Sequence, residues 1–298
     1  MGALDGRVAI VTGAARGLGR AHALRLAAEG ASVVVNDLGA QPGAPGATSE
    51  PDGAPGSIES VVSEIGSMGG RVVAAAFDVS DWSGAEEVVG TALAEFGDVH
   101  ILVNNAGNLR DRMLVSMTEA DWDDVVRVHL KGHAGMLHFA AAHWREQAKA
   151  GHDVRASVVN TTSTSGLLGN PGQSNYGAAK AGVAALTVIA AEELGRYGVR
   201  VNAVAPAART RMTETTPGLA EIVRPPSNPS AFDVWDPENV SPLVAYLATS
   251  DCPITGKVFF VQGGRIRAFD PWALGATIEK DGRWNVDELA GKLPTLEA

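Results

Sequence analysis

Short apolar runs rich in β-branched residues recur along the whole chain and alternate with longer stretches of helical pattern. Runs of this kind, bounded by turn residues, predict β-strands. Seven of them lie at residues 8–12, 32–36, 72–77, 101–104, 157–160, 199–204 and 258–261. Because these runs are apolar throughout and do not alternate, both faces of each strand should be covered, by helices such as those predicted over 17–28 and 175–197. The chain is therefore expected to have an α/β fold, a doubly wound seven-stranded parallel sheet with helices on both faces.

The length of the chain fits one such domain followed by a tail. The chain has 298 residues, of which 45% are hydrophobic, and this is enough to bury one large core. We expect a single domain, with its core at residues 5–267 and a C-terminal extension at 268–298. Within the extension, the run Asp281-Gly282-Arg283 predicts a turn and residues 286–293 a short helix, which could dock on a partner subunit or on its own chain.

Two further segments interrupt the alternation of strands and helices. Residues 39–56 combine glycine, proline and small residues with too little apolar material to pack, and they predict a mobile surface loop. Residues 210–232 contain Pro225, Pro226 and Pro229 and lie between the sixth strand and a late helix. This position suits a lid over a substrate cleft, and it suits an ordinary loop equally well.

Charge and composition argue against several classes of protein. With a net charge of −10 and no block of lysine or arginine, the chain is not expected to bind nucleic acid. No apolar stretch reaches the ~18 residues of a membrane span, and the first six residues lack a secretory signal. The lone Cys252 cannot form an internal disulfide and is interpreted as a structural residue in a reducing compartment. A soluble, cytoplasmic protein is expected.

Three glycines follow the first predicted strand. The run Thr12-Gly13-Ala14-Ala15-Arg16-Gly17-Leu18-Gly19 stands at a strand-to-helix turn. Glycine lets the backbone approach a pyrophosphate closely, and the N-terminus of the following helix favours negative charge. A glycine pattern alone could be a tight turn, but in this context of strand and helix it predicts a nucleotide site.

The residue that closes the second strand indicates which dinucleotide this site would bind. Asp37 stands eighteen residues after Gly19, where a carboxylate can accept hydrogen bonds from ribose hydroxyls and would repel a 2′-phosphate. Arg16 could attract such a phosphate, but Leu38, and not an arginine, follows Asp37. NAD is therefore favoured over NADP.

Tyr176 and Lys180 are four residues apart in a predicted helix, so their side chains share one face. A free tyrosine has a pKa near ~10 and is a poor base at neutral pH, whereas a nearby ammonium lowers that pKa. The pair could therefore move a proton. It could also be a core tyrosine beside a solvated lysine, and only its combination with the nucleotide site favours catalysis.

Several motifs at the predicted strand ends and in the predicted helix occur together. They are the glycine turn, Asp37, Asn104-Asn105-Ala106-Gly107 after the fourth strand, Ser163, Tyr176 and Lys180. In combination they resemble the short-chain dehydrogenase/reductase family over about residues 5–267. The resemblance implies hydride exchange with a nicotinamide while Tyr176 passes a proton to or from the substrate oxygen, Ser163 holds that oxygen and Lys180 contacts the ribose. The cofactor-binding residues that it implies are Gly13, Arg16, Gly17, Leu18, Gly19, Asp37, Asp78, Val79, Asn105, Ala106, Gly107, Tyr176, Lys180 and Pro206.

The resemblance also bears on a serine before Tyr176 and on a histidine in an earlier predicted helix. Ser163 lies thirteen residues before Tyr176, the family's usual spacing, and Ser165 is the weaker candidate. His129 stands where many members of the family carry a helix asparagine, so it could hold a water of the proton relay or only pack. His129 and His133 share a helical face but lack the glutamate and the further ligands of a metal motif, so no metal is expected.

A closer resemblance comes from four stretches, at residues 36–39, 109–113, 127–130 and 169–176. They are similar to the (3R)-hydroxyacyl-CoA dehydrogenase unit of peroxisomal multifunctional enzyme type 2, whose relatives include 17β-hydroxysteroid dehydrogenase type 4. This resemblance implies NAD-dependent oxidation of a (3R)-hydroxyacyl-CoA by a homodimer or homotetramer. The arginines that could reach CoA phosphates, or form only a solvated rim, are Arg110, Arg112, Arg209 and Arg211.

Three other functions remain open at this point. The same proton and hydride apparatus could oxidise a free hydroxysteroid, because it serves any secondary alcohol. It could also reduce a 3-ketoacyl group with NADPH, which Asp37 disfavours. A nucleotide-sensing scaffold could keep the fold without turnover, but it would have little reason to hold Ser163, Tyr176 and Lys180 together.

Overall fold

The computed structural model describes residues 2–38, 56–215, 218, 220–228, 230–270 and 273–296. The chain divides into two compact units, Met1–Ala268 and Phe269–Ala298. Of the loop predicted at 39–56, only Gly56 is among the described residues.

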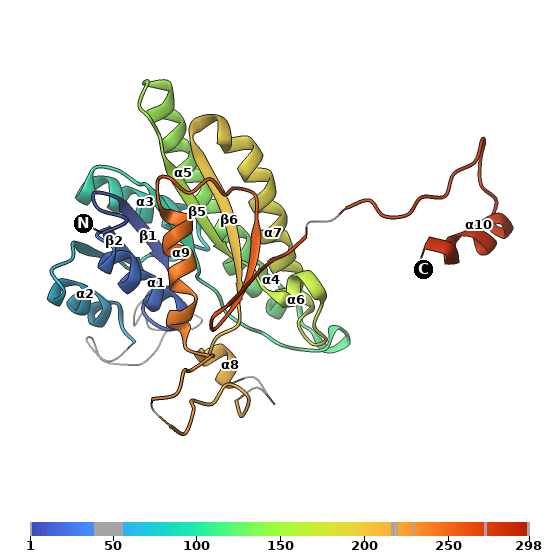
Figure 1. Ribbon diagram of the computed structural model, residues 1–298, viewed down its shortest axis with the longest axis horizontal. Coiled ribbons are helices and arrows are strands. Elements are labelled where there is room, and N and C mark those ends of the chain that lie inside the picture. The colour runs from blue at the N-terminus through green and yellow to red at the C-terminus, as the bar shows by residue number, and fades with distance from the viewer. Residues whose placement is uncertain are drawn as a thin grey trace. The chain divides into compact units, whose positions relative to one another are not determined.

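One eight-stranded sheet forms the centre of the first unit (Figure 1). The strands follow the order β3-β2-β1-β4-β5-β6-β7-β8, and all pairs from β3 to β7 are parallel. Their bounds are β1 Val8–Thr12, β2 Ser32–Asn36, β3 Val72–Ala75, β4 Ile101–Asn104, β5 Ala156–Thr161, β6 Val199–Pro206, β7 Val258–Gln262 and β8 Arg265–Ala268. The predicted doubly wound α/β fold is confirmed.

The number of strands is a correction to the prediction of seven. The additional strand, β8, pairs antiparallel with β7, with Arg265 opposite Gln262. All its residues are exposed. A short edge strand that carries Arg265 and Arg267 buries little apolar surface, so no apolar run in the sequence marks it.

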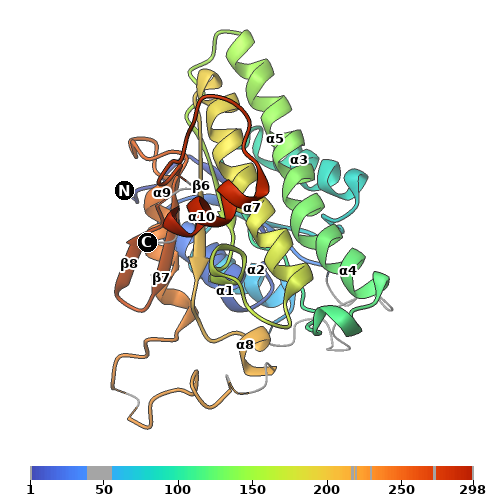
Figure 2. The same ribbon diagram turned by 90° about the vertical axis from the view of Figure 1, so that its right-hand side faces the viewer.

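Helices cover both faces of the sheet (Figures 1 and 2). One face is covered by α1 Gly17–Ala28, α2 Ile58–Ser67 and α9 Ser241–Ala248, and the other by α3 Trp82–Phe96, α5 Gly132–Lys149 and α7 Ser174–Leu194. Ala9 and Val11 of β1 belong to the first of these cores, and Val8 and Ile10 to the second. Burial on both sides therefore explains why the strands are apolar without alternation.

Shorter elements surround the carboxyl ends of the strands. α4 Glu119–Val126 begins at a capping box of Thr118 and Asp121, and it continues into α5 through a π-helical turn, η2 Arg127–Lys131. The others are η1 Leu114–Ser116, α6 Thr164–Leu168, η3 Gly195–Tyr197, α8 Arg211–Thr215 and η4 Pro237–Asn239. Among the described residues, no helix combines the length and apolar character that crossing a membrane requires.

The second unit is built around α10 Val286–Lys292, which η5 Leu293–Leu296 follows. The Asn285 side chain accepts the N–H of Glu288, and the Glu288 carboxylate accepts the N–H of Asn285, both at 2.9 Å. This reciprocal cap explains why a short helix begins here, close to the predicted bounds.

The strand order places a crevice at the carboxyl ends of β1 and β4. From β1 the chain proceeds outward to β2 and β3, and it then continues with β4 on the other side of β1. In doubly wound sheets, ligands bind in the crevice beyond two such strands. The turns that follow β1 and β4 therefore frame the candidate site.

Candidate active site

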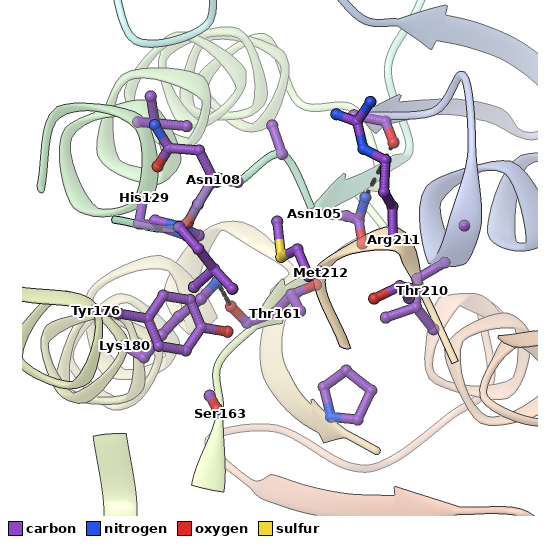
Figure 3. Close-up of a pocket in the computed structure, with 18 of the residues that line it drawn as sticks. Asn105, Asn108, His129, Thr161, Ser163, Tyr176, Lys180, Thr210, Arg211 and Met212 are labelled. Carbon is purple, nitrogen blue, oxygen red and sulfur yellow. Dashed lines mark hydrogen bonds between the residues drawn. The ribbon is translucent and has the colours of Figure 1, made fainter. Parts of the chain in front are cut away.

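A cavity of about 730 Å³ lies at the carboxyl ends of the strands (Figure 3). The turns after β1 to β6, together with η2 and α7, contribute its walls. The predicted residues that line it are Gly13, Arg16, Gly17, Leu18, Asp37, Asp78, Val79, Asn105, Ala106, Gly107, His129, Ser163, Tyr176, Lys180 and Pro206. Gly19 is the one predicted site residue that does not line the cavity.

Two glycines bring helix α1 against the end of β1. Gly13 has a φ of +65°, and a Cβ there would lie 2.8 Å from the Cα of Ala106. A Cβ on Gly19 would lie 2.0 Å from the carbonyl oxygen of Gly13. Gly19 therefore packs the helix against the turn, whereas Gly13 faces the cavity.

The turn after β1 is hydrogen-bonded to the turn after β4. The Thr12 hydroxyl accepts the N–H groups of Asn105 and Ala106 at 3.0 and 3.1 Å. The Asn105 side-chain amide donates to the carbonyls of Thr12 and Gly13 at 3.0 and 3.2 Å. Thr12 is not among the predicted site residues, although a polar residue that closes an apolar strand is a signal that could have identified it.

The N-terminus of α1 opens into the same turn. Its N-cap residue, Arg16, has an extended backbone and makes no side-chain capping hydrogen bond, and the first turn contains no acidic residue. The positive end of the helix dipole is therefore available to an anion. Together with the close approach that Gly13 allows, these features fit the pyrophosphate of a dinucleotide.

Two carboxylates line the cavity beyond β2 and β3. Asp37 accepts hydrogen bonds from two backbone N–H groups at 3.0 and 2.8 Å. Asp78 accepts the hydroxyl of Ser80 at 2.6 Å and the guanidinium of Arg127 at 3.2 Å. Burial raises the pKa of Asp78, but the hydrogen bonds from Ser80 and Arg127 outweigh burial and bring that pKa below its ordinary value. Asp78 is therefore ionised at neutral pH.

Tyr176, Lys180 and His129 lie beside one another in the cavity (Figure 3). The Nζ of Lys180 is 5.7 Å from the ring centroid of Tyr176, and the rings of His129 and Tyr176 meet edge to face with centroids 5.1 Å apart. Lys180 Nζ also donates to the carbonyl of Thr161, at the end of β5, over 2.5 Å. The four-residue spacing on α7 thus places the phenol and the amine on one face, as predicted.

The pKa shifts of this pair differ from expectation. Burial raises the pKa of Tyr176, and a hydrogen bond with Ser163 only partly offsets the rise. Burial lowers the pKa of Lys180 to about 7. The expectation that a lysine cation lowers the tyrosine pKa is wrong in this structure, because the burial that disfavours the phenolate also disfavours the ammonium.

His129 is buried on the π-helical turn η2. Its Nε2 lies 2.8 Å from the carbonyl oxygen and 3.1 Å from the nitrogen of Asn108, and its tautomer decides which of these contacts is the hydrogen bond. Burial, followed by the proximity of Lys180, holds the pKa of His129 well below its ordinary value, so the ring is neutral. Gly107 makes room for it, since a Cβ there would lie 2.2 Å from Cε1 of His129.

Three histidines in the described part of the chain have a buried ring nitrogen without a hydrogen-bond partner. They are His22 at Nε2, and, beside the cavity, His129 at Nδ1 and His133 at Nε2. Burial also holds the pKa of His133 well below its ordinary value. Across the described residues, no three His, Cys, Asp or Glu side chains gather into a group that could hold a metal ion.

Ser163 and Ser165 have different surroundings after β5. Ser163 is the N-cap of α6, and its Oγ accepts the N–H of Ser165 at 3.1 Å. The hydroxyl of Ser165 donates to the side chain of Gln173 at 2.8 Å, a cavity residue that the sequence analysis missed. Ser163 is the serine whose hydrogen bond lowers the pKa of Tyr176. It is therefore better placed than Ser165 to act with that tyrosine.

Three of the four arginines considered for CoA phosphates are paired with carboxylates. The pairs are Arg110 with Asp124 at 3.1 Å, Arg112 with Asp121 at 3.0 Å, and Arg209 with Asp233. Arg110 and Arg112 are exposed, and exposed ion pairs of this kind exchange partners at little cost. Arg209 is only 17% exposed, so its interpretation as a phosphate ligand is not supported. Arg211 lines the cavity.

The sequence matches the model of one enzyme family. Residues 7–218 match the family model described as short chain dehydrogenase. The chain belongs to the short-chain dehydrogenase family, and it is an oxidoreductase whose family uses a nicotinamide dinucleotide, NAD or NADP.

Similar proteins have names within this class. The chain is 42% identical to hydroxyacyl-CoA dehydrogenase ChsB1 of Mycobacterium tuberculosis, over 97% of this chain and 88% of that protein. It is 39% identical to peroxisomal multifunctional enzyme type 2 of Mus musculus, over 93% of this chain but 34% of that longer protein. The crystal structure of a short chain dehydrogenase from Mycobacterium avium superposes with a TM-score of 0.86 at 47% identity, covering 99% of this chain and 96% of that one.

Proposed function

We propose that this protein uses NAD to oxidise a secondary alcohol to a ketone, and that the alcohol is a (3R)-hydroxyacyl-CoA. The observation that carries the proposal is one cavity that contains both the glycine turn at Gly13 and Gly17 and the side chains of Ser163 and Tyr176. The turn suits a dinucleotide pyrophosphate, and the two hydroxyls suit a reacting oxygen.

Asp37 supports NAD as the cofactor. Its carboxylate lines the cavity and is held by two backbone N–H groups. A carboxylate fixed in this position can accept the ribose hydroxyls, and it repels a 2′-phosphate. Arg16 acts in the opposite sense, because its positive charge would attract a 2′-phosphate. Burial and the nearby Arg211 lower the pKa of Arg16, and the nearby Asp37 raises it.

Tyr176 is the proposed acid and base of the reaction. When bound, the nicotinamide would accept the hydride from the alcohol carbon in oxidation and would return it in reduction. In oxidation, the Tyr176 phenolate takes the hydroxyl proton of the alcohol while Ser163 Oγ holds the same oxygen by a hydrogen bond. Because burial raises the pKa of Tyr176, its phenol keeps the proton at neutral pH. Oxidation should therefore become faster as the pH rises, whereas ketone reduction starts from the protonated form.

Lys180 and His129 are proposed to carry the proton onward. A pKa of about 7 allows the Lys180 amine to give or take a proton at neutral pH. His129 places a buried Nδ1, with no partner among the described residues, close to Tyr176 and Lys180. Such a nitrogen can hold a relay water, because buried polar atoms require a hydrogen-bond partner.

The choice of an acyl-CoA rests on two kinds of support. Four stretches of the sequence resemble (3R)-hydroxyacyl-CoA dehydrogenase units, and the mycobacterial relative carries the name hydroxyacyl-CoA dehydrogenase. Arg110 lines the cavity, and its exposed guanidinium could exchange Asp124 for a phosphate. The same apparatus would serve a free hydroxysteroid or a 3-ketoacyl group, so the experiment must include both.

The test is the rate of NADH formation with matched 3R and 3S hydroxyacyl-CoA substrates and with free hydroxysteroids, using NAD and NADP in parallel. We expect turnover with the 3R acyl-CoA and NAD. Equal rates for the two stereoisomers, or none with either, would contradict the proposal. Activity on steroids alone, or faster reduction of a 3-ketoacyl substrate by NADPH, would select the corresponding alternative.

We also infer that the protein is a homodimer or homotetramer. Large apolar side chains on α6 and α7 are exposed, with Leu168 74%, Val188 40% and Ile189 54% accessible. Val188 and Ile189 are consecutive on α7, and contiguous apolar surface often marks contact with another subunit. Light scattering of the purified protein should give two or four times the mass of one chain, and the mass of a single chain would contradict the inference.

A further inference from the structure

One arginine ties the chain just after β6 to a much later segment. Arg209 lies three residues beyond Pro206, and its backbone N–H donates to the carbonyl of Trp235 at 2.6 Å. Its guanidinium donates to the carbonyl of Val223 at 3.0 Å and to the carboxylate of Asp233. These contacts join positions 14 to 26 residues apart, so the local sequence cannot specify them.

Asp233 makes further hydrogen bonds within the segment that Arg209 contacts. Its carboxylate accepts the N–H of Trp235 at 3.0 Å, and its backbone carbonyl accepts the side chain of Asn239 at 2.8 Å. The hydrogen bond from Arg209 lowers the pKa of Asp233 in spite of burial. The side chains of Arg209 and Asp233 are only 17% and 18% exposed, so water covers little of this ion pair.

Two of the residues held in this way border the candidate active site. Val223 and Trp235 line the cavity that also contains Ser163 and Tyr176. Trp235 is partly exposed, whereas Val223 is 1% exposed and packs behind the surface of the cavity. The segment thus contributes Trp235 to the wall around the space in which a substrate alcohol would react, with Val223 as its buried support.

The neighbouring side chains of the segment contact the edge of the sheet. Gly263 stands between β7 and β8 with a φ of +54°, and a Cβ there would lie 2.6 Å from Val234 and 3.3 Å from Phe232. Apolar contacts of this kind have no preferred direction and allow a loop to shift along the surface. A charged pair with defined hydrogen bonds specifies one position.

We propose that the Arg209–Asp233 ion pair positions Trp235, supported from behind by the buried Val223, as the substrate-facing wall of the cavity, and that the shape of this wall selects the apolar group attached to the reacting alcohol. Arg209 and Asp233 act through Val223 and Trp235 and are positioning residues. The identity of the substrate rests on the proposed function, but the wall and its support do not.

The test compares two variants of the ion pair with a matched control. Arg209→Gln and Asp233→Asn each remove one charge of the buried pair. Arg224→Gln removes an exposed pair with Glu221 on the same segment, whose side chains are 66% and 77% accessible. The measured quantities are kcat/KM for long-chain and short-chain 3-hydroxyacyl-CoA and the affinity for NADH by fluorescence titration.

We expect either change at the buried pair to lower kcat/KM for the long-chain substrate by about 10²-fold and to lower it less for the short-chain one, because a displaced wall misplaces the larger group more. A variant that combines Arg209→Gln with Asp233→Asn should lose little more than each single variant, because the two residues act as one unit. NADH affinity and the control should stay at the wild-type values. An equal loss for both substrates, or a loss of NADH affinity, would overturn the proposal.

Two variants test the wall without disturbing a charge. Val223→Ala and Trp235→Ala each remove side-chain volume from the wall. They should raise the ratio of kcat/KM for the long-chain substrate to that for the short-chain one. An unchanged ratio in both variants would contradict the selection of substrate by these residues.

The outcome separates this proposal from the proposed function. If the wild type oxidises only free hydroxysteroids, the acyl-CoA assignment fails. The ratio of kcat/KM for bulky steroid alcohols to that for small ones then tests the wall. A second measurement does not depend on turnover. The backbone N–H of Arg209 donates to Trp235, and the backbone N–H of Trp235 donates to Asp233. Hydrogen exchange at both amides should therefore become faster in Asp233→Ala. Unchanged exchange would contradict the positioning role.

Discussion

The two ends of the cavity are held in place by different means. At the end where we propose that the cofactor binds, called the cofactor end below, backbone turns lie directly at the strand ends, and Thr12 and Asn105 bond these turns to each other. At the substrate end, a long segment is held by the charges of Arg209 and Asp233. Damage at the first end should therefore weaken cofactor binding with every substrate, whereas damage at the second should change which substrate is accepted.

The largest effect is expected at Tyr176, where the two ends meet. Tyr176→Phe removes the proposed proton carrier but keeps the ring, so kcat should fall by roughly 10³-fold with every substrate. NADH affinity should stay close to that of the wild type. Tyr246→Phe is the control, because Tyr246 lies on α9 and is 48% exposed. A Tyr176→Phe enzyme with normal kcat would remove the proposed mechanism.

Replacement of Lys180 by methionine should lower kcat less than Tyr176→Phe does, by roughly 10²-fold, and yet stabilise the fold. Lys180 is buried, and in the described residues no carboxylate forms an ion pair with it. Its pKa falls from 10.5 in the unfolded chain to about 7 in the folded one. Taking away a buried charge of this kind should raise the free energy of unfolding by roughly 2–4 kcal/mol at neutral pH.

The stabilisation by Lys180→Met should depend on pH. Between pH 7 and 10.5 the unfolded chain binds a proton at Lys180 that the folded chain does not, so wild-type stability should rise with pH across that window. The advantage of Lys180→Met should therefore be full below pH 7 and disappear toward pH 10.5. Chemical denaturation at several pH values measures it, with the exposed Lys149→Met as control. A destabilised variant at pH 7 would contradict the burial argument.

A smaller effect tests the backbone geometry of the cofactor end. Gly13→Ala forces a Cβ to within 2.8 Å of the Cα of Ala106 at a positive φ, and it should weaken NADH binding by roughly tenfold or more. Gly66→Ala, in α2 with nothing within 4 Å of the new Cβ, should leave binding unchanged. Isothermal titration compares the two variants. Equal affinities would show that the turn does not hold the dinucleotide.

The smallest expected change concerns the choice between the two dinucleotides. Asp37→Ser removes the carboxylate that would repel a 2′-phosphate, so the ratio of kcat/KM for NADP to that for NAD should rise by roughly tenfold. The ratio of long-chain to short-chain substrates should not change, because Asp37 belongs to the cofactor end. If the substrate ratio moves and the dinucleotide ratio does not, the division into two ends is wrong.

The glycine turn and Asp37 could be predicted from the residues alone because their determinants are local, whereas Asp78, Val79 and Pro206 followed from the resemblance to the family. Glycines at a strand-to-helix turn and polar residues at the ends of apolar strands stand next to the elements that place them. Thirteen of the fourteen predicted cofactor residues line the cavity. Gly19 does not, because a pattern of glycines cannot tell which glycine faces a ligand and which one packs a helix.

The substrate end could not be predicted because its determinants are far apart in the chain. The carboxylate that pairs with Arg209 lies 24 residues later, and no periodicity connects the two. Strand β8 was missed because its exposed residues form no apolar run. The direction of the Tyr176 pKa shift was missed because it depends on burial in the folded chain. Spacing places Lys180 beside Tyr176, but only the packed structure shows that both are buried.

The most direct test of the account is a crystal structure of the protein with NAD bound. We expect the pyrophosphate at the N-terminus of α1, the adenosine ribose at Asp37, and the nicotinamide beside the hydroxyls of Tyr176 and Ser163. Electron density for the dinucleotide elsewhere on the molecule, or a nicotinamide remote from Tyr176, would contradict the claim that one cavity joins the cofactor to the proton carrier.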